Sequence, residues 1–300
     1  MSDTALATAA TAAELEPVGE DSPRGAAVLR ELLRKPRFVL SALAILVITL
    51  MAAFPRLFTA TDPTVCDLKL SKGAPSAAHW FGYDIQGCDY YANVIYGARP
   101  SVLVSVSVCV VGFAVACVLG MLAGYFPGFV DSLVSRTADV LFALPGLVAM
   151  IVILQAFSSR SVWTIAFVIV LLGWPAGMRL MRSTVLSVRT REYVLASRAL
   201  GAGAPHILRV HILPNSVAPL LALTTLTVGA AVGTEAALTF LGIGLQPPTI
   251  SWGLQIAIAA SYRDDVHLFL FPALLLTITV MAFMIMGDTV RDALDPKLKR

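Results

Sequence analysis

The stretch "EYVLASRALGAGAPHILRVHILPNSVAPL", Glu192–Leu220, decides how the rest of the chain is interpreted, because it separates two long apolar runs. It contains two arginines, two histidines, three prolines and two glycines. A mixed, polar segment between apolar runs is typical of a loop that joins two membrane spans on one side of the bilayer. Which side it faces, and whether it does more than connect, depends on the surrounding sequence.

Composition places the chain in a membrane. Its 300 residues are 57% hydrophobic and 14% charged, with a mean hydropathy of +0.80, whereas a soluble domain is roughly a quarter charged. The net charge of +3 is too small to indicate a nucleic-acid partner. About 20 apolar residues cross a bilayer as a helix. We therefore expect an all-α membrane protein with six spans. The expected spans are Phe38–Phe58, Val102–Gly124, Val140–Phe157, Trp163–Met181, Val217–Gly242 and Leu268–Gly287.

The distribution of positive charge predicts the orientation of these spans. Lys and Arg collect on the cytoplasmic side of membrane proteins. With the N-terminus inside, 16 of the 22 Lys and Arg residues fall in cytoplasmic segments and six fall outside. The bias places both termini and the quoted stretch in the cytoplasm, and it leaves two external loops, 59–100 and 246–267. Residues 1–36 lack the pattern of a secretory signal peptide, and we expect a partly disordered cytoplasmic tail there.

Four cysteines divide between two environments. Cys109 and Cys117 lie in the second expected span, where they pack as small apolar residues. Cys66 and Cys88 lie in the first external loop, on the oxidising side of the membrane. The sequence permits either a disulfide between them, which would contribute about 3 kcal/mol, or two thiols that never meet.

The quoted stretch predicts two short helices around a glycine turn. Thr190 is a suitable N-cap, and Glu192 lies in the first turn, where a negative charge is favourable. Gly201 suits the end of the first helix. Pro205 suits the first turn of the second helix, and Pro214 is expected to stop it, so that Asn215 or Ser216 can cap the fifth span.

The surface of this helix pair has two interpretations. Ala196, Ser197 and Ala199 are small and permit another backbone to approach closely, so the segment could dock against another protein. It could equally be a plain connector whose basic residues serve only to orient the spans. The residues alone do not decide between a docking surface and a connector.

Several residues inside the expected spans also have alternative roles. Glu235 could line a pathway or gate, or it could bond a neighbouring helix near the outer end of its span. Arg136 and Asp139 are spaced for an ion pair on one helix, and Pro145 is placed to kink the third span. The small-residue pair Gly120–Gly124 permits a close helix contact, either within the chain or with a partner subunit.

Motifs of catalysis are missing from the sequence. There is no G-x-x-x-x-G-K-[ST] loop for ATP phosphates and no H-E-x-x-H zinc motif. The histidines are scattered, so no metal or catalytic site is expected. An intramembrane hydrolase and a stand-alone secondary transporter are the rival classes. The second requires ion-coupling groups within the membrane, where Glu235 is the only clear carboxylate.

"LASRALG" (195–201) followed by "HILP" (211–214) resembles the EAA signature of ABC-importer permeases. Ala196 and Ser197 fall on the two alanine positions, and Gly201 falls on the glycine. The Leu-Pro positions are also matched, whereas the family glutamate and isoleucine are replaced. The matched Leu-Pro pair is Leu213 and Pro214, and the replacements are Leu195 and His211.

Four further stretches narrow the resemblance to DppC/OppC-type permeases of the peptide/nickel group. They are "HWFGYDIQGCDYYANVIYGARPSVLVS" (79–105), "RTADVLFALPGL" (136–147), "EAALTFLGIGLQPPTISWG" (235–253) and "GDTVRDALDPKLKR" (287–300). Tyr83 and Cys88 depart from the usual Thr and Arg of the first stretch. The match covers nearly all of residues 37–300.

The resemblance implies a type I ABC-importer permease in a prokaryotic cytoplasmic membrane, and not an enzyme. A first span and external loop (37–100) would precede a permease core (101–300), with coupling helices at 190–214 whose contacts include Glu192, Ala196, Ser197 and Gly201. Implied partners are a DppB/OppB-like second permease, DppD/DppF-like ATPase subunits that hold ATP and Mg, and a DppA/OppA-like binding protein. The implied cargo is a dipeptide or oligopeptide, with nickel chelates and haem-like ligands as alternatives.

Overall fold

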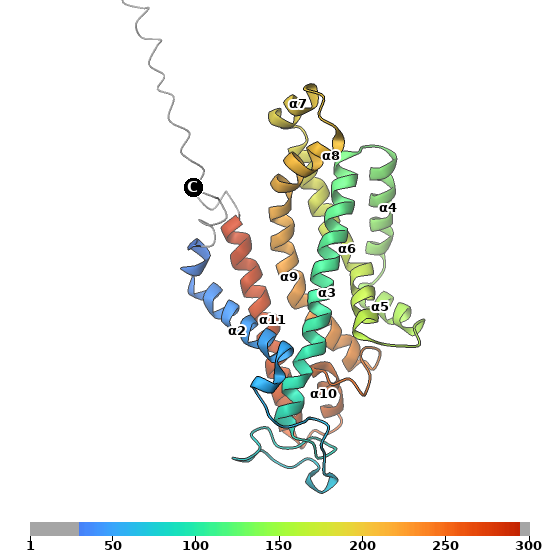
Figure 1. Ribbon diagram of the computed structural model, residues 1–300. Helices are drawn as coiled ribbons and strands as arrows, with labels where there is room; N and C mark the ends of the chain where they lie inside the picture. Colours follow the sequence, from blue (N-terminus) through green and yellow to red (C-terminus); the bar gives the residue numbers. More distant parts are fainter. Residues whose placement is uncertain (1–29, 295–300) are drawn as a thin grey trace, which may run out of the picture.

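The computed structural model describes residues 30–294, and within this range its regular secondary structure is helical, with no β-strand. Seven helices form the main body: α2 (Pro36–Ala53), α3 (Tyr90–Tyr125), α4 (Phe129–Ala143), α5 (Gly146–Gln155), α6 (Val162–Val188), α9 (Leu213–Phe240) and α11 (Val266–Leu294). α3 packs between α6 and α9, and α11 packs against α9 and α2 (Figure 1). Most of the expected N-terminal tail, 1–29, lies outside the described residues.

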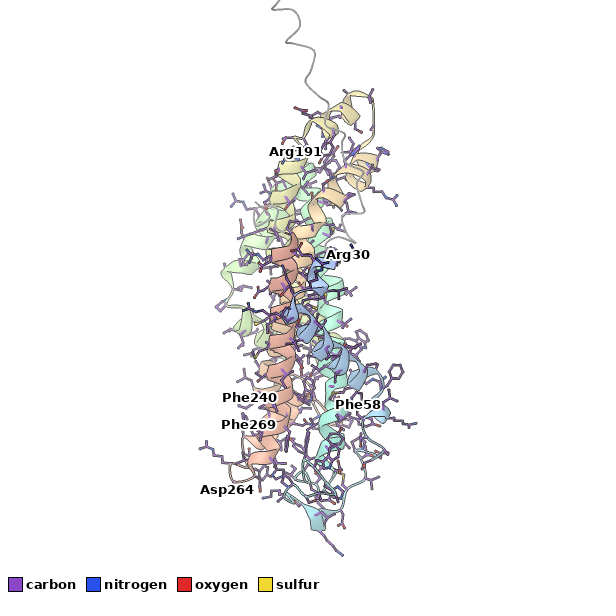
Figure 2. The ribbon with its side chains drawn as sticks, turned by 90° about the vertical axis from the view of Figure 1, so that its left-hand side faces the viewer. Arg30, Phe58, Arg191, Phe240, Asp264 and Phe269 are labelled. Carbon is purple, nitrogen blue, oxygen red and sulfur yellow. A yellow bond between two sulfur atoms is a disulfide. The ribbon has the colours of Figure 1, made fainter. Side chains whose placement is uncertain are left out.

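The two ends of the bundle differ in structure. At one end lie the short helices α7 (Glu192–Ala199) and α8 (Ala204–Ile207); at the other lie the loop before α3 and α10 (Trp252–Ala259) (Figure 1). Figure 2 shows Arg191 near the first end and Asp264 at the opposite one. The 3-10 turns Pro55–Leu57 and Leu68–Leu70 lie in the loop before α3.

Five helices are long and apolar enough to cross a membrane, and a sixth span results if α4 and α5 are counted together. The expected kink of the third span at Pro145 is confirmed, because the axes of α4 and α5 differ by 93°, but the helical segment begins at Phe129 and not at Val140. The break occurs at Leu144–Pro145. Leu144 is extended, as residues before proline tend to be, and Pro145 precedes the first residue of α5.

Polar side chains fix where two helices begin, one of them earlier than expected. α3 begins at Tyr90 and not near Val102, since the Asp89 carboxylate accepts the Ala92 N–H at 2.8 Å and Pro100 is accommodated within the helix. The Ser251 hydroxyl accepts the Leu254 N–H at the start of α10. The loop before α3 is therefore shorter than the expected 59–100.

The glycine pair of α3 serves close packing within the chain. A Cβ on Gly120 would lie 2.6 Å from Met181 Cβ, and a Cβ on Gly124 would lie 2.7 Å from Val185 Cβ. Both distances are too short for real atoms, so only glycine permits α3 and α6 to approach this closely. The structure thus uses Gly120–Gly124 for an internal contact.

Two ion pairs connect α4 to α6. Asp131 accepts two hydrogen bonds from Arg182, at 2.6 and 2.7 Å, and Asp139 accepts one from Arg179 at 2.7 Å. The expected pair of Asp139 with Arg136 on the same helix is therefore wrong. A helix packed alongside offers Asp139 a guanidinium at hydrogen-bonding distance, whereas a pair three residues apart on one exposed helix face gains little.

Candidate functional site

The helix α7 protrudes from one end of the bundle on a single apolar anchor. Val194 is fully buried and packs in a cluster with Val185 of α6, Ile207 of α8 and Ile212. Burial of one valine contributes about 1.5–3 kcal/mol, enough to hold one face of a two-turn helix. The remaining residues of α7 are exposed or half-buried, so the helix presents its other faces outward.

A glycine turn ends α7 as the sequence predicts. Gly201 has φ +86°, the left-handed conformation that glycine adopts without strain. The Gly201 N–H donates to the Arg198 carbonyl at 3.0 Å, and the Ala202 N–H donates to the Ser197 carbonyl at 3.1 Å. These two bonds form a Schellman motif, which satisfies the carbonyls at the helix end. Nothing lies within 4 Å of a Cβ built on Gly201, so its outer side is open.

An apolar residue stands at the tip of this turn. Leu200 is 89% exposed, more than any other large apolar side chain in the described part of the chain. Tyr193 and Leu195 are also exposed on α7. We refer to Tyr193, Leu195, Ala196, Leu200 and Gly201 as the α7 surface. Sequence reasoning missed Leu200; its position directly before the turn glycine, where the helix can no longer bury it, is the signal that could have identified it.

Arginines attach the base of α7 to α3. Arg189 donates to the Gly124 carbonyl at 2.9 Å, and Arg198 donates to the Tyr125 hydroxyl at 3.4 Å while lying over its ring. The predicted N-cap at Thr190 is wrong: its hydroxyl donates to the Ser187 carbonyl, and Arg191 occupies the cap position. The helix α7 therefore begins one residue later than predicted, directly after Arg189 and Arg191.

The second predicted coupling helix is not a separate element. The chain forms one continuous helix from Ala204 to Phe240, and Pro214 does not stop it. A π-turn at Leu208–Ile212 explains this, since the Leu213 N–H donates to the Leu208 carbonyl and the wider turn makes room for the Pro214 ring. Asn215 is not a cap either; its side-chain amide donates to the His211 carbonyl.

The predicted contact residues consequently divide into two groups. Glu192, Ala196, Ser197 and Gly201 lie on α7 and its turn, where Ser197 is half-buried and the other three are exposed. Leu213 and Pro214 lie at the start of α9, and Leu213 packs against the cluster that holds Val194. Leu213 thus supports α7 through the Val194 cluster, whereas Pro214 is exposed.

Glu235 of α9 is enclosed by hydroxyl groups. It is 0% exposed, and its carboxylate accepts hydrogen bonds from Ser101 of α3 at 3.0 Å and Thr239 at 2.9 Å. The Thr239 hydroxyl in turn accepts the Leu245 N–H at 3.1 Å. Glu235 lines neither of the two cavities described below. This geometry favours the structural one of its two interpretations, a carboxylate that connects α3 to α9.

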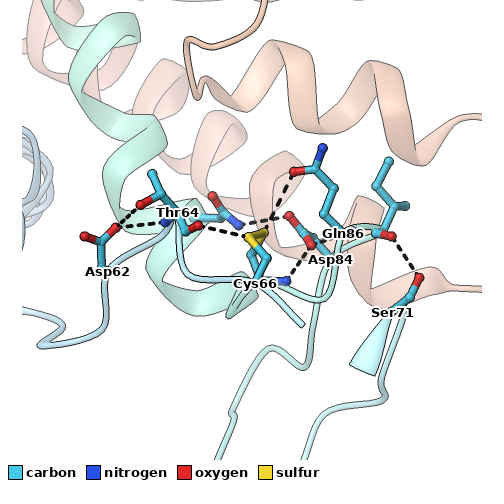
Figure 3. The surroundings of a disulfide bond; sticks show 9 residues. Asp62, Thr64, Cys66, Ser71, Asp84 and Gln86 are labelled. Atoms are coloured by element: carbon cyan, nitrogen blue, oxygen red, sulfur yellow. Dashed lines mark hydrogen bonds between the residues drawn. A yellow bond between two sulfur atoms is a disulfide. The ribbon is translucent and has the colours of Figure 1, made fainter. Parts of the chain in front are cut away.

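The cysteines of the loop before α3 form a disulfide. Cys66 and Cys88, whose Cα atoms are 4.1 Å apart, are joined, the first of the two states that the sequence permits. Around the bridge, the Asp84 carboxylate accepts the backbone N–H groups of Gln86 and Cys88, each at 2.8 Å (Figure 3). The disulfide and the carboxylate together give this loop a fixed shape over the end of the bundle.

Two cavities within the described residues bear on the function. One, of about 410 Å³, lies between the disulfide-closed loop, the 246–251 segment and α10. The other, of about 220 Å³, lies inside the bundle between α3, α6 and α9. Small residues of α6 and hydroxyl-bearing residues of α9 line the inner one, among them Gly173, Gly177, Thr224, Thr227 and Thr234. Within the described residues no group of three or more His, Cys, Asp or Glu could hold a metal ion.

Known proteins resemble this chain over most of its length. OppC, the oligopeptide transport system permease protein of Bacillus subtilis (strain 168), is 37% identical over 258 residues, 85% of this chain and 84% of that protein. DppC, the dipeptide transport system permease protein of the same organism, is 38% identical over 228 residues, 75% and 71% of the two chains. GsiD, the glutathione transport system permease protein of Escherichia coli O6:K15:H31 (strain 536 / UPEC), is 35% identical over 275 residues, 90% and 89%.

The fold and the family are shared more widely. A chain in the crystal structure of an amino acid ABC transporter with histidines superposes with a TM-score of 0.51 at 12% identity, covering 67% of this chain and 94% of that one. Residues 116–300 match the family described as "Binding-protein-dependent transport system inner membrane component". Identity along most of the length, a matching family domain and an all-helical bundle with apolar spans agree: the chain belongs to the family of binding-protein-dependent transport system inner membrane components.

Proposed function

We propose that the chain is one of two permease subunits of an ATP-driven peptide importer in a prokaryotic cytoplasmic membrane. Its five or six spans form half of a translocation path, and a homologous second permease forms the other half. An extracytoplasmic binding protein delivers the cargo. ATP and Mg belong to cytoplasmic ATPase subunits, and this chain performs no hydrolysis. The observation that carries the proposal is the exposed α7 surface on a firmly anchored turn.

The charge distribution supports a cytoplasmic α7 surface. Arg179, Arg182, Arg189, Arg191 and Arg198 all lie in α6, α7 or the turn between them. Lys and Arg at this density mark the cytoplasmic side of a membrane protein. With six spans, both termini would lie in the cytoplasm and the disulfide-closed loop would lie outside, where disulfides persist.

The anchoring of α7 supports coupling by rigid-body motion. Val194 packs on α6 and α8, and Arg189 and Arg198 bond α3, so a partner that moves α7 also moves these helices. Closure of an ATPase pair would thereby shift the spans between outward and inward openings. ATP can shift this equilibrium only by its differential affinity for the two states.

Peptide cargo is supported by the relatives. The three permeases above are named for oligopeptide, dipeptide and glutathione transport, and glutathione is itself a small peptide. The inner cavity has a mostly apolar lining that includes the hydroxyl groups of Thr224, Thr227 and Thr234 and carries no fixed charge along the path. Such a lining would let peptides of differing side chains pass.

The test is peptide uptake into proteoliposomes. Their membrane contains the chain with its second permease and the ATPase subunits, and the binding protein is added outside. Uptake should require ATP. Gly201→Asp should abolish it and leave insertion intact, since Asp tolerates the left-handed backbone and places a charge in the docking surface. Gly203→Ala is the matched control, because Gly203 has an ordinary φ and its Cβ would meet only Pro205 Cδ, at 3.8 Å. Uptake that an ion gradient drives without ATP, or full uptake by Gly201→Asp, contradicts the proposal.

A further inference from the structure

The cavity at the end opposite α7 has the size of a ligand site. Its volume of about 410 Å³ lies within the range of roughly 300–1,000 Å³ that small-molecule sites occupy. Apolar side chains form much of its wall, among them Ile85, Pro247, Ile250, Leu254 and Leu268. A wall that is mostly apolar with a few convergent polar groups is the usual composition of a binding site.

The polar part of the wall includes two buried amide side chains and a half-buried carboxylate, joined by hydrogen bonds. The Gln255 amide N–H donates to the Asn93 backbone carbonyl at 2.9 Å, and the Asn93 side-chain amide donates to Asp84 Oδ2 at 3.1 Å. Asn93 and Gln255 are 7% and 8% exposed. Each amide uses one of its two N–H groups in these bonds, and two acceptors on this wall have capacity for a donor: Asp84 Oδ2 and the oxygen of Gln255.

The Gln255 oxygen has no hydrogen-bond partner within residues 30–294, although it is buried. Its identity as oxygen follows from the bond that the other amide atom donates to the Asn93 carbonyl. A buried acceptor without a donor is destabilising, and a ligand that brings an N–H group would relieve this. The site therefore lacks a donor.

The Asp84 carboxylate also lacks a cation. Two basic side chains of the loop before α3 pair elsewhere: Lys72 with Asp265 at 3.7 Å, and His79 with Asp89 at 2.7 Å. No ion pair to Asp84 occurs in the described part of the chain. Burial raises the pKa of Asp84 against the opposing effect of the backbone N–H groups that it accepts, so a cation placed beside it would be favourable.

We propose that this cavity binds the protonated amino end of a short peptide, with the ammonium group at Asp84 and Gln255 and an apolar side chain against the Leu254 wall. The inference rests on the proposed peptide cargo and adds a binding site on the permease itself. A lysine side chain of a docked protein carries the same ammonium group. A free peptide fits better, because one lysine side chain would fill only part of a cavity of this volume.

The test compares Leu-Leu with N-acetyl-Leu-Leu on the full-length chain in lipid nanodiscs, by isothermal titration calorimetry. Acetylation removes the positive charge and keeps the apolar side chains. Loss of one charge-assisted hydrogen bond weakens affinity roughly tenfold to hundredfold. We therefore expect Leu-Leu to bind more tightly than N-acetyl-Leu-Leu by this factor. This comparison needs no variant, so it remains decisive if a variant fails to fold.

Variants then assign the preference to the site. Asp84→Asn should abolish the difference between the two peptides. Asp62→Asn is the matched control: Asp62 lies in the same loop, is bonded to Thr64 and lines no cavity, so the preference should persist. Gln255→Met, similar in shape, should weaken Leu-Leu binding by about tenfold.

Equal affinities for the two peptides, or no binding of either, overturn the inference. A loss of binding-protein affinity in Asp84→Asn without peptide binding also overturns it, and identifies a protein lysine as the occupant. ATP-driven uptake measured in parallel separates the two proposals. If uptake occurs but the chain binds neither peptide, the proposed site at Asp84 and Gln255 is refuted and the import function stands. If the chain prefers Leu-Leu but no uptake occurs, the site is supported and the import function is refuted.

Discussion

Leu200→Ser is the most direct perturbation of the α7 surface. Leu200 is 89% exposed at the end of α7 and packs against nothing that it would lose. The substitution keeps the Gly201 turn and the buried Val194 anchor. Since surface substitutions away from packed features usually change stability by within about 0.5 kcal/mol, the melting temperature and membrane insertion should equal those of the unmodified chain.

Binding to an ATPase partner should respond strongly. A leucine that is almost fully exposed in the free chain and buried in a groove of the partner contributes about 1.5–3 kcal/mol. Its loss corresponds to roughly a tenfold to 150-fold weaker affinity. We expect this decrease in biolayer interferometry with the nanodisc-embedded chain and the ATPase subunit, together with a parallel loss of transport-coupled ATP hydrolysis.

Leu68→Ser supplies the control. Leu68 is 76% exposed in the loop before α3, at the opposite end of the bundle. Its substitution should leave the affinity for the ATPase unchanged. If Leu200→Ser binds the ATPase as tightly as the unmodified chain, or if the two variants lose affinity equally, then α7 is a connector and the reasoning from its exposure is refuted.

Three further perturbations test the scaffold around the site. Glu235→Gln should fold and transport normally, whereas Glu235→Leu should cost about 1–3 kcal/mol for the orphaned hydroxyl groups, measured as urea midpoints in micelles; equal midpoints would exclude the network. Replacing Cys66 and Cys88 by serine should destabilise the external loop by about 3 kcal/mol, seen as faster proteolysis that reductant no longer changes. A double-mutant cycle on Asp131 and Arg182 should give a coupling of about 1.5–3 kcal/mol; a value near zero would show that α4 is held by other contacts.

Local patterns allowed part of the end that carries α7 to be predicted. The C-terminus of α7 at Gly201 follows from glycine's access to positive φ, which depends only on neighbouring residues. The effect of Pro214 was mispredicted because its outcome depends on whether the preceding turn can widen. Apolar packing of Ile212 and Leu213 stabilises that π-turn, and a window of sequence does not reveal such tertiary support.

Ionic partners were mispredicted for a related reason. Asp139 has a candidate partner three residues away, but the guanidinium of Arg179 on α6 lies closer once the helices pack. Glu235 was predicted either to line a pathway or to bond a neighbouring helix, and its hydrogen-bond partner Ser101 is 134 positions distant in the chain. A carboxylate near apolar surroundings is costly when it is unpaired, and this is why the sequence drew attention to both residues. Which partner satisfies each carboxylate depends on helix packing.

In the proposed orientation, we infer that the chain divides mechanically into a fixed external end and a movable cytoplasmic lever. At the external end, the Glu235 network holds α9 to α3, and the Cys66–Cys88 bridge closes the loop before α3. At the cytoplasmic end, the Val194 cluster connects α7 to α6 and α8, and α8 continues into α9. Because α6 and α9 both line the inner cavity, a displacement of α7 moves two of its walls while the outer end of α9 stays joined to α3. Such a lever would change the width of the cavity at its cytoplasmic side first, which is where an imported peptide must leave.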